Sequence, residues 1–185
     1  MKKLLLVLVL LTACIVDFTT ANKPSQNGKS SAKVIMATDS SKGELNQFKL
    51  FKERITGLWK CKMGKDTNYY WKCIADENYI EATGRIIYKG KLLSESHSYI
   101  VYEKNIDKCI WTEIVHDSET YVYAWWFTSS TTYEAVPVKD LCNPSAASFQ
   151  MKFEQITPDS IKQTIKIKNK VVDVFNFHRI KYKAG

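Results

Sequence analysis

The sequence has few of the features that familiar enzymes or fibrous proteins would require. Its 185 residues include only four Pro and seven Gly, which argues against disorder in the domain. It has three His, and no spacing of Cys and His matches a zinc site. There is no Gly-x-Ser-x-Gly nucleophile pattern, phosphate loop or paired-carboxylate signature. We therefore predict no catalytic or metal-binding residue.

Long apolar runs are also scarce, because the chain has only one, at its N-terminus. Lys2 and Lys3 precede the apolar run Leu4 to Leu11, and small residues follow at 12–14. This is the tripartite pattern of a secretory signal peptide. Residues 4–16 fall short of the ~20 apolar residues that a membrane-spanning helix needs. We predict an exported protein whose signal peptide covers residues 1–21.

The end of this signal has two interpretations. The segment Leu11 to Cys14 is similar to the bacterial lipobox, whose Cys is lipidated and becomes the first residue. Cleavage after Ala21 is the alternative, with Thr19 and Ala21 as the small residues. Residues 22–42 are rich in Ser, Lys, Asn and Thr and predict a flexible tether. A lipidated Cys14 would attach the protein to a membrane, in the periplasm or at the outer membrane. Otherwise the protein is expected to be soluble and secreted.

Charge is unbalanced towards the positive sign. Lys and Arg number 27 against 19 Asp and Glu, for a net charge of +8. Basic proteins can bind nucleic acids or anionic surfaces. Here the Lys residues are spread along alternating positions and form no compact block. We interpret them as a solvated face and predict no nucleic-acid partner.

Period-two alternation dominates the chain after residue 57. Trp59 and Cys61 alternate with Lys60 and Lys62, and similar patterns recur to the C-terminus. Turn signals such as residues 89–91 separate the runs at short intervals. The spacing predicts about ten short strands joined by hairpins, in an up-and-down barrel or a sandwich. Before them, helical spacing predicts a short helix within residues 43–55, so the predicted domain covers residues 43–185.

Cysteines could link these strands after export. The predicted domain contains Cys61, Cys73, Cys109 and Cys142. Disulfides persist in an oxidising compartment. A hairpin turning over residues 63–68 would place Cys61 opposite Cys73 on one face, which predicts a Cys61–Cys73 disulfide. The remaining pair would then be Cys109–Cys142, and free buried thiols are the alternative.

A short motif at the start of the first strand resembles that of a known family. Gly57-Leu58-Trp59 after a short helix is similar to the lipocalin Gly-x-Trp signature. In lipocalins and other calycins, an Arg near the end of the last strand packs over that Trp, and the resemblance implies this role for Arg179. The pattern extends from Leu45 to Lys183 and also resembles small lipocalin-like domains of bacterial envelopes. It implies an all-β, antiparallel, calycin-like barrel with a leading helix. About ten strands rather than eight are expected, and other lipocalin loop motifs are lacking, so no ligand-binding residues carry over.

Two segments supply candidate walls for a ligand site. Ser94, Ser96 and Ser98 share one face of a strand, where small hydroxyl groups would leave space and offer hydrogen bonds. Residues 121–127 form the densest aromatic segment. We predict a non-enzymatic binding protein for a small apolar or amphipathic ligand. The predicted ligand-binding residues are Trp71, Ser94, Ser96, Tyr123 and Trp125.

Three alternatives remain open. Some calycin-like barrels bind haem through a His on a late strand, so the resemblance offers His178 as a haem ligand; otherwise no cofactor is predicted. Glu95 and His97 could do acid–base chemistry if they faced inward, although we expect them in solvent. A barrel filled with side chains would instead favour a protein–protein interaction or inhibitor module.

Overall fold

The computed structural model describes residues 46–115 and 120–181. The predicted signal peptide, Cys14 and the tether over 22–42 lie outside these residues. Within them the chain forms an α-helix, ten β-strands and three short 3₁₀ turns. Across the same residues, no helix combines the length and the apolar character needed to cross a membrane.

The helix α2 spans Gln47–Ile55 and begins at a capping residue. The Asn46 side chain accepts a hydrogen bond from the backbone N–H of Lys49 at 2.9 Å. A spacing of four places Gln47, Phe51 and Ile55 on one face, and all three are buried. The predicted short helix within 43–55 is therefore confirmed.

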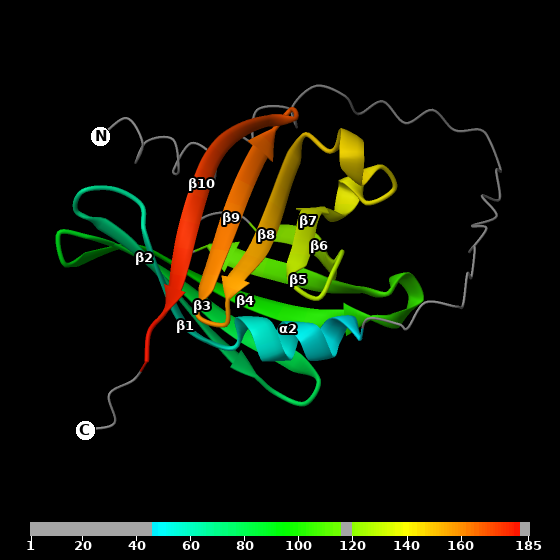
Figure 1. Ribbon diagram of the computed structural model, residues 1–185, viewed down its shortest axis with the longest axis horizontal. Helices are drawn as coiled ribbons and strands as arrows, with labels where there is room; N and C mark the ends of the chain where they lie inside the picture. The colour runs from blue at the N-terminus through cyan, green and yellow to red at the C-terminus, as the bar shows by residue number, and fades with distance from the viewer. Residues whose placement is uncertain (1–45, 116–119, 182–185) are drawn as a thin grey trace. The chain divides into compact units, whose positions relative to one another are not determined.

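The strands form one closed antiparallel barrel (Figure 1). Each strand pairs with the next in sequence, and β10 returns to pair with β1, so the sheet has no free edge. The predicted all-β, up-and-down barrel of about ten strands with a leading helix is confirmed. The strands are β1 (Gly57–Lys62), β2 (Thr67–Ala75), β3 (Tyr79–Tyr88), β4 (Lys91–Glu103), β5 (Lys108–Val115), β6 (Thr120–Phe127), β7 (Thr132–Pro137), β8 (Phe149–Thr157), β9 (Ser160–Ile167) and β10 (Lys170–Arg179).

One end of the barrel is covered by α2, and we call it the closed end. Phe51 packs against Trp125, Phe127 and Tyr133, with ring centroids 4.7–5.5 Å apart. The Gln47 side chain pairs with the backbone of Phe127: it accepts from the N–H at 2.6 Å and donates to the carbonyl at 3.4 Å. These contacts bury the polar end of Gln47 without leaving it unpaired, so the helix seals this end.

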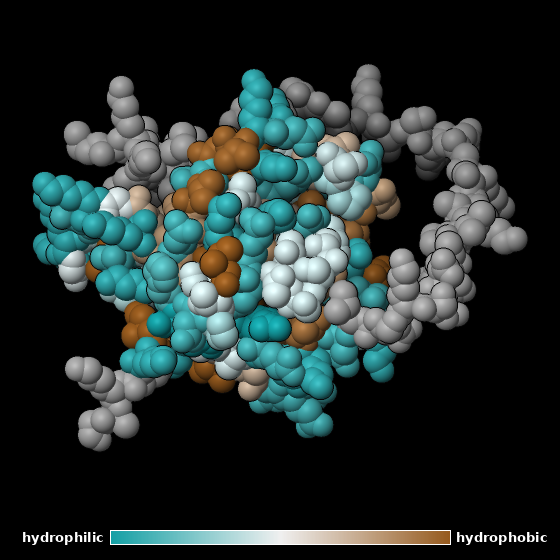
Figure 2. Space-filling model, in the orientation of Figure 1, coloured by the Kyte–Doolittle hydropathy of each residue, from teal (hydrophilic) through white to brown (hydrophobic). Residues whose placement is uncertain are grey.

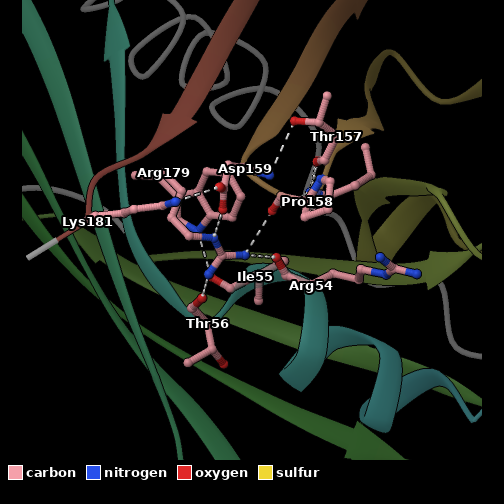
Figure 3. A network of polar contacts seen from close by, with 10 residues as sticks. Arg54, Ile55, Thr56, Thr157, Pro158, Asp159, Arg179 and Lys181 are labelled. Carbon is pink, nitrogen blue, oxygen red and sulfur yellow. Dashed lines mark hydrogen bonds and ion pairs between the residues drawn. The ribbon is translucent and has the colours of Figure 1, made fainter.

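Arg179 joins the helix, the first strand and the turn between β8 and β9 at the closed end (Figure 3). Its guanidinium lies 4.3 Å from the centroid of the Trp59 ring, a cation–π distance. It donates to the Thr56 carbonyl and, at 3.1 Å, to the Arg54 carbonyl, which are groups the end of a helix leaves without partners. Asp159 Oδ1 forms an ion pair with its Nε at 3.2 Å. The structure thus places Arg179 over Trp59, as the resemblance implied.

Gly57 is required by this arrangement for two reasons. Its φ is +130°, a backbone conformation that side chains disfavour. A Cβ at this position would also lie 2.6 Å from Arg179 Nη1, well inside van der Waals contact. The glycine therefore lets the arginine reach the helix carbonyls.

The cysteine pairing differs from the predicted one because the β1–β2 turn is shorter than expected. The Met63 N–H donates to the Thr67 carbonyl at 3.0 Å, so the chain has already reversed by residue 67. Cys61 consequently pairs with Tyr69, and Cys73 pairs with Gly57. Cys109 is buried and Cys142 is exposed, and all four thiols are free. Neither Cys61–Cys73 nor Cys109–Cys142 forms a disulfide in the structure.

Candidate functional site

The barrel interior changes from one end to the other. At the closed end the inward side chains are sealed, and Ile100, Trp125 and Tyr133 are each 0% exposed. Towards the opposite end, some inward-facing side chains such as Thr67, Ile86 and Val115 are buried, while several others are only half-buried. Strand pairing places these residues inside, so their partial exposure shows that this part of the interior is open to solvent. We call it the open half; its half-buried inward residues include Tyr69, Ser94, Glu113, Tyr121, Tyr123, Gln163, Ile165 and Asp173.

Aromatic side chains form the floor of the open half, around a cavity of about 40 Å³. Trp125 lies 4.6 Å from Trp111 and 6.2 Å from Trp71, measured between ring centroids. This volume admits one or a few water-sized groups, whereas drug-sized ligands occupy ~300–1,000 Å³. A ligand could place only one small group in the floor. Its lining residues are Tyr69, Trp71, Trp111, Trp125, Phe153, Ile161, Gln163 and Phe177.

Two of the floor residues carry buried hydrogen-bond donors without acceptors. The indole N–H groups of Trp111 and Trp125 have no hydrogen-bond partner within the described residues. Buried donors are nearly always paired, and leaving one unpaired costs roughly 1–3 kcal/mol. Since both side chains line the cavity, a ligand or water with an acceptor group bound there could satisfy them.

Glu113 is a carboxyl group among hydroxyl groups on the inner face. Its neighbours across the ladder are Ser98 on β4 and Tyr121 on β6. Burial raises the pKa of Glu113, and a hydrogen bond from Ser96 opposes this rise. The pKa of Tyr69 is raised well above its usual range by burial first and then by the charge of Glu113. We call Tyr69, Ser96 and Glu113 the carboxyl cluster.

Gly84 makes room for the carboxyl cluster. It lies on β3 between Trp71 of β2 and Ser96 of β4. A Cβ at this position would lie 2.5 Å from the Tyr69 hydroxyl and 2.6 Å from Ser96 Oγ. Any side chain here would displace both hydroxyl groups, so the glycine permits their approach.

A second carboxyl group, Asp173, belongs to the opposite wall. It lies on β10, beside a register shift, and pairs with the inward Ile165 of β9. Its Oδ1 accepts from the Val174 N–H at 2.8 Å. Asp173 also contributes, after burial, to raising the pKa of the Cys61 thiol to about 11. Two inward carboxyl groups therefore face the open half from different strands.

The buried thiols inside the barrel have low reactivity. Burial raises the pKa of Cys109 to about 12 and that of Cys73 well above its usual range. The thiolate is the reactive form, so these groups are poor nucleophiles at neutral pH. In the part of the chain that the structure describes, no group of three or more His, Cys, Asp or Glu is arranged to hold a metal ion.

The predicted wall residues gather in the interior. Trp71 and Trp125 line the floor. Ser96 and Tyr123 face inward above it, and Ser94 pairs with the inward Ile86. All five therefore belong to one interior surface.

The alternative His residues lie elsewhere. His178 is exposed on the outer face, paired with Lys60, so it does not point inward as the haem interpretation required. His97 is exposed as well, and Glu95 accepts from Arg85 Nε at 2.6 Å on the outer face. Neither residue reaches the interior, so the inward acid–base pair is absent.

Sequence reasoning missed Glu113, Trp111 and Asp173. A signal for Glu113 was present, because Cys109, Trp111 and Val115 share its strand parity and a carboxylate among them is unusual. No such signal existed for Asp173. The register shift between Val171 and Asp173 interrupts the alternation that would have assigned its face.

No protein-family model matches this chain, and no curated protein matches it. The structure defines the architecture of the described residues, which is a closed ten-stranded antiparallel barrel with one covered end. This architecture is compatible with a calycin-like barrel.

Proposed function

We propose that this protein is an exported, non-enzymatic binding protein that holds a small amphipathic ligand in the open half of its barrel. One observation carries the proposal: several inward side chains of the open half, among them Glu113, Tyr121 and Tyr123, are half-buried, whereas those at the closed end are sealed. Small barrels can hold one ligand in such an interior.

The walls offer both kinds of contact that an amphipathic ligand needs. An apolar group fits the aromatic floor, where Trp71 and Trp111 provide ring surfaces. The unpartnered indole N–H groups of Trp111 and Trp125 can donate to an acceptor. Ser94 and Ser96 add hydroxyl groups on the adjoining wall.

The closed end supports binding by keeping these walls rigid. The packing of Phe51 and the contacts of Arg179 hold the helix and the barrel strands together. A preformed site loses less conformational entropy when a ligand binds. The sealed end therefore contributes to affinity without touching the ligand.

A titration with a neutral probe tests the proposal. In wild type, 2-phenylethanol should change the tryptophan fluorescence. Trp111→Phe should weaken binding about fivefold, since it removes one indole donor. Trp126→Phe is the matched control, because Trp126 lies on the outer face of β6 beside Lys108. Equal effects of the two variants would contradict the proposed site, and native mass spectrometry of protein from its own source should show a bound small molecule.

Export and membrane attachment are part of the proposal. The signal pattern of residues 1–21 supports export, and Cys14 supports attachment through a lipid. Mass spectrometry of the mature N-terminus distinguishes the two cleavage sites. A lipidated first residue at Cys14 is the expected result for an anchored protein, whereas a chain beginning at Asn22 would exclude the anchor.

A second candidate function, docking of a partner protein, is favoured by apolar side chains on the outer face. Tyr79, Tyr99 and Val101 are each 37–46% exposed on β3 and β4. The rings of Tyr79 and Tyr99 are 6.1 Å apart, and Ile114 on β5 is 50% exposed. Ile114→Glu should then abolish co-purification of a partner and leave 2-phenylethanol binding unchanged.

A further inference from the structure

The carboxyl groups inside the barrel contrast with the positive net charge of the chain. The chain carries a net charge of +8, and one face is covered mainly by hydrophilic residues with isolated hydrophobic ones (Figure 2). The described inward positions of the open half include Glu113 and Asp173, whereas Lys91 and Lys170, which share the inward register, lie exposed at the rim. Arg179, the nearest inward arginine by strand parity, lies at the closed end against Asp159 and the helix carbonyls. The open half is therefore an acidic interior in a basic protein.

A carboxylate inside a barrel is costly without a positive charge nearby. Buried charges in proteins are usually paired, because desolvation strongly disfavours an isolated ion. The neighbours identified for Glu113 in the described structure are Ser96, Ser98, Tyr69 and Tyr121. These are neutral hydroxyl groups, which can donate hydrogen bonds but cannot balance the charge. A cationic ligand would supply the missing charge.

The aromatic surfaces around the carboxyl cluster favour the same ligand chemistry. Trp71, Trp111 and Tyr69 line the floor, and the Tyr123 ring lies 5.2 Å from that of Trp111, on the strand that pairs with that of Glu113. The faces of such rings attract ammonium groups, most strongly where water is excluded. An anionic ligand would meet two carboxyl groups and the negative faces of the rings, so the site disfavours it.

The spacing of these groups indicates the length of the ligand. Glu113 lies two residues beyond Trp111 along β5, towards the open half. At about 3.3 Å per residue, this places Glu113 roughly 7 Å from Trp111 along the strand. An arylalkylamine with a short linker spans this distance, with its apolar end in the floor.

We infer that the open half binds a small organic cation whose ammonium group pairs with Glu113 and whose apolar end enters the aromatic floor. This inference rests on the proposed function. It specifies the class of ligand that the same site selects.

Three probes of one shape and different charge test the inference. Isothermal titration of the full chain at neutral pH would compare 2-phenylethylamine, 2-phenylethanol and phenylacetate. The protonated amine should bind about tenfold more tightly than the alcohol, the order expected for one charge-assisted contact. Phenylacetate should bind more weakly than both.

Two variants test whether the preference for the amine depends on Glu113. Glu113→Gln should lower the affinity for the amine to that for the alcohol and leave alcohol binding within about twofold, because only the charge is removed. Glu81→Gln is the matched control: its carboxyl group lies on the outer face of β3, opposite the exposed Tyr99. It should leave all three affinities unchanged.

The outcomes separate the inference from the function on which it rests. Equal binding of amine and alcohol to wild type, or an amine preference that survives in Glu113→Gln, would overturn the inference while the binding function stands. If none of the three probes binds, the proposed function fails as well. Circular dichroism of each variant would show that the barrel is intact, and the wild-type comparison does not depend on any variant.

Discussion

The two ends of this barrel are built from the same strands and differ in what they accomplish. On β4, Ile100 is sealed at the closed end, whereas Ser94 lies half-buried in the open half. On β5, Cys109 is fully buried, and Glu113 is half-buried further along. The closed end gathers aromatic packing, the helix and Arg179, while the open half gathers hydroxyl and carboxyl groups.

The difference teaches that stability and binding are separated along the strand direction. Close packing at the closed end removes apolar surface from water, the main favourable contribution to folding. Glu113 and the unpaired indole N–H groups reduce stability, because they are desolvated without full compensation. A well-packed end allows the other end to retain such groups for a ligand.

The largest expected difference between the ends is in aromatic truncation. Phe51→Ala should lower the free energy of unfolding by about 3–5 kcal/mol, because the ring is fully buried among three aromatic neighbours. Tyr123→Ala, at a half-buried ring in the open half, should cost roughly 1–2 kcal/mol. Urea denaturation measures both, and equal losses would remove the distinction between the ends.

Glycine substitutions give the next largest contrast. Gly57→Ala should destabilise by roughly 2–3 kcal/mol, since it combines an unfavourable φ with a clash against Arg179. Gly90, in the β3–β4 hairpin, has a φ of +79° and nothing within 4 Å of an added Cβ. Gly90→Ala should therefore cost only about 1 kcal/mol. Thermal unfolding compares the two, and a similar cost would show that Arg179 moves away freely.

The rate of thiol labelling compares the solvent accessibility of the two ends at individual cysteines. The exposed Cys142 should react rapidly with a thiol reagent, and the buried thiols slowly. Cys61, towards the open half with a pKa of about 11, should react faster than Cys109, at the closed end with a pKa of about 12. Peptide mapping after timed labelling measures the order. Faster labelling of Cys109 than of Cys61 would mean that the closed end opens first.

The smallest expected effect is a pH-dependent gain in stability from Glu113→Gln. Burial raises the pKa of Glu113 in the folded state, so the folded protein binds this proton more tightly than the unfolded chain. Wild type consequently loses stability as the pH rises from the ordinary Glu pKa, about 4.3, through the raised value.

Above that window the variant should be more stable than wild type by about 1 kcal/mol, and below it the difference should vanish. Urea denaturation at acidic and at neutral pH measures this difference. Among the described residues, the other groups facing Glu113 are the hydroxyl side chains of Tyr69, Ser96, Ser98 and Tyr121, and burial raises the pKa of Tyr69 well above this range. A gain that does not change with pH would assign the effect to packing rather than to charge.

Much of the fold was predictable from alternation, and the errors have specific causes. The helix within 43–55 and about ten strands followed from local patterns, because backbone geometry sets both periods. The cysteine register was wrong, since one hydrogen bond between Met63 and Thr67 shortens the turn. The site was predicted only in part: Trp71 and Ser96 followed from their faces, whereas Glu113 was overlooked and Asp173 lies beside a register shift.

By itself, the sequence determined the strand count, the helix and which side chains share a face of the sheet. These properties depend on neighbours within a few residues along the chain. Only the tertiary structure decided which end of the barrel is sealed and which carboxyl groups face a common interior. Barrel closure brings β10 against β1 and carries Glu113 and Asp173 to one space from strands far apart in sequence. Burial and electrostatic environment depend on such distant neighbours, so no local pattern could specify them.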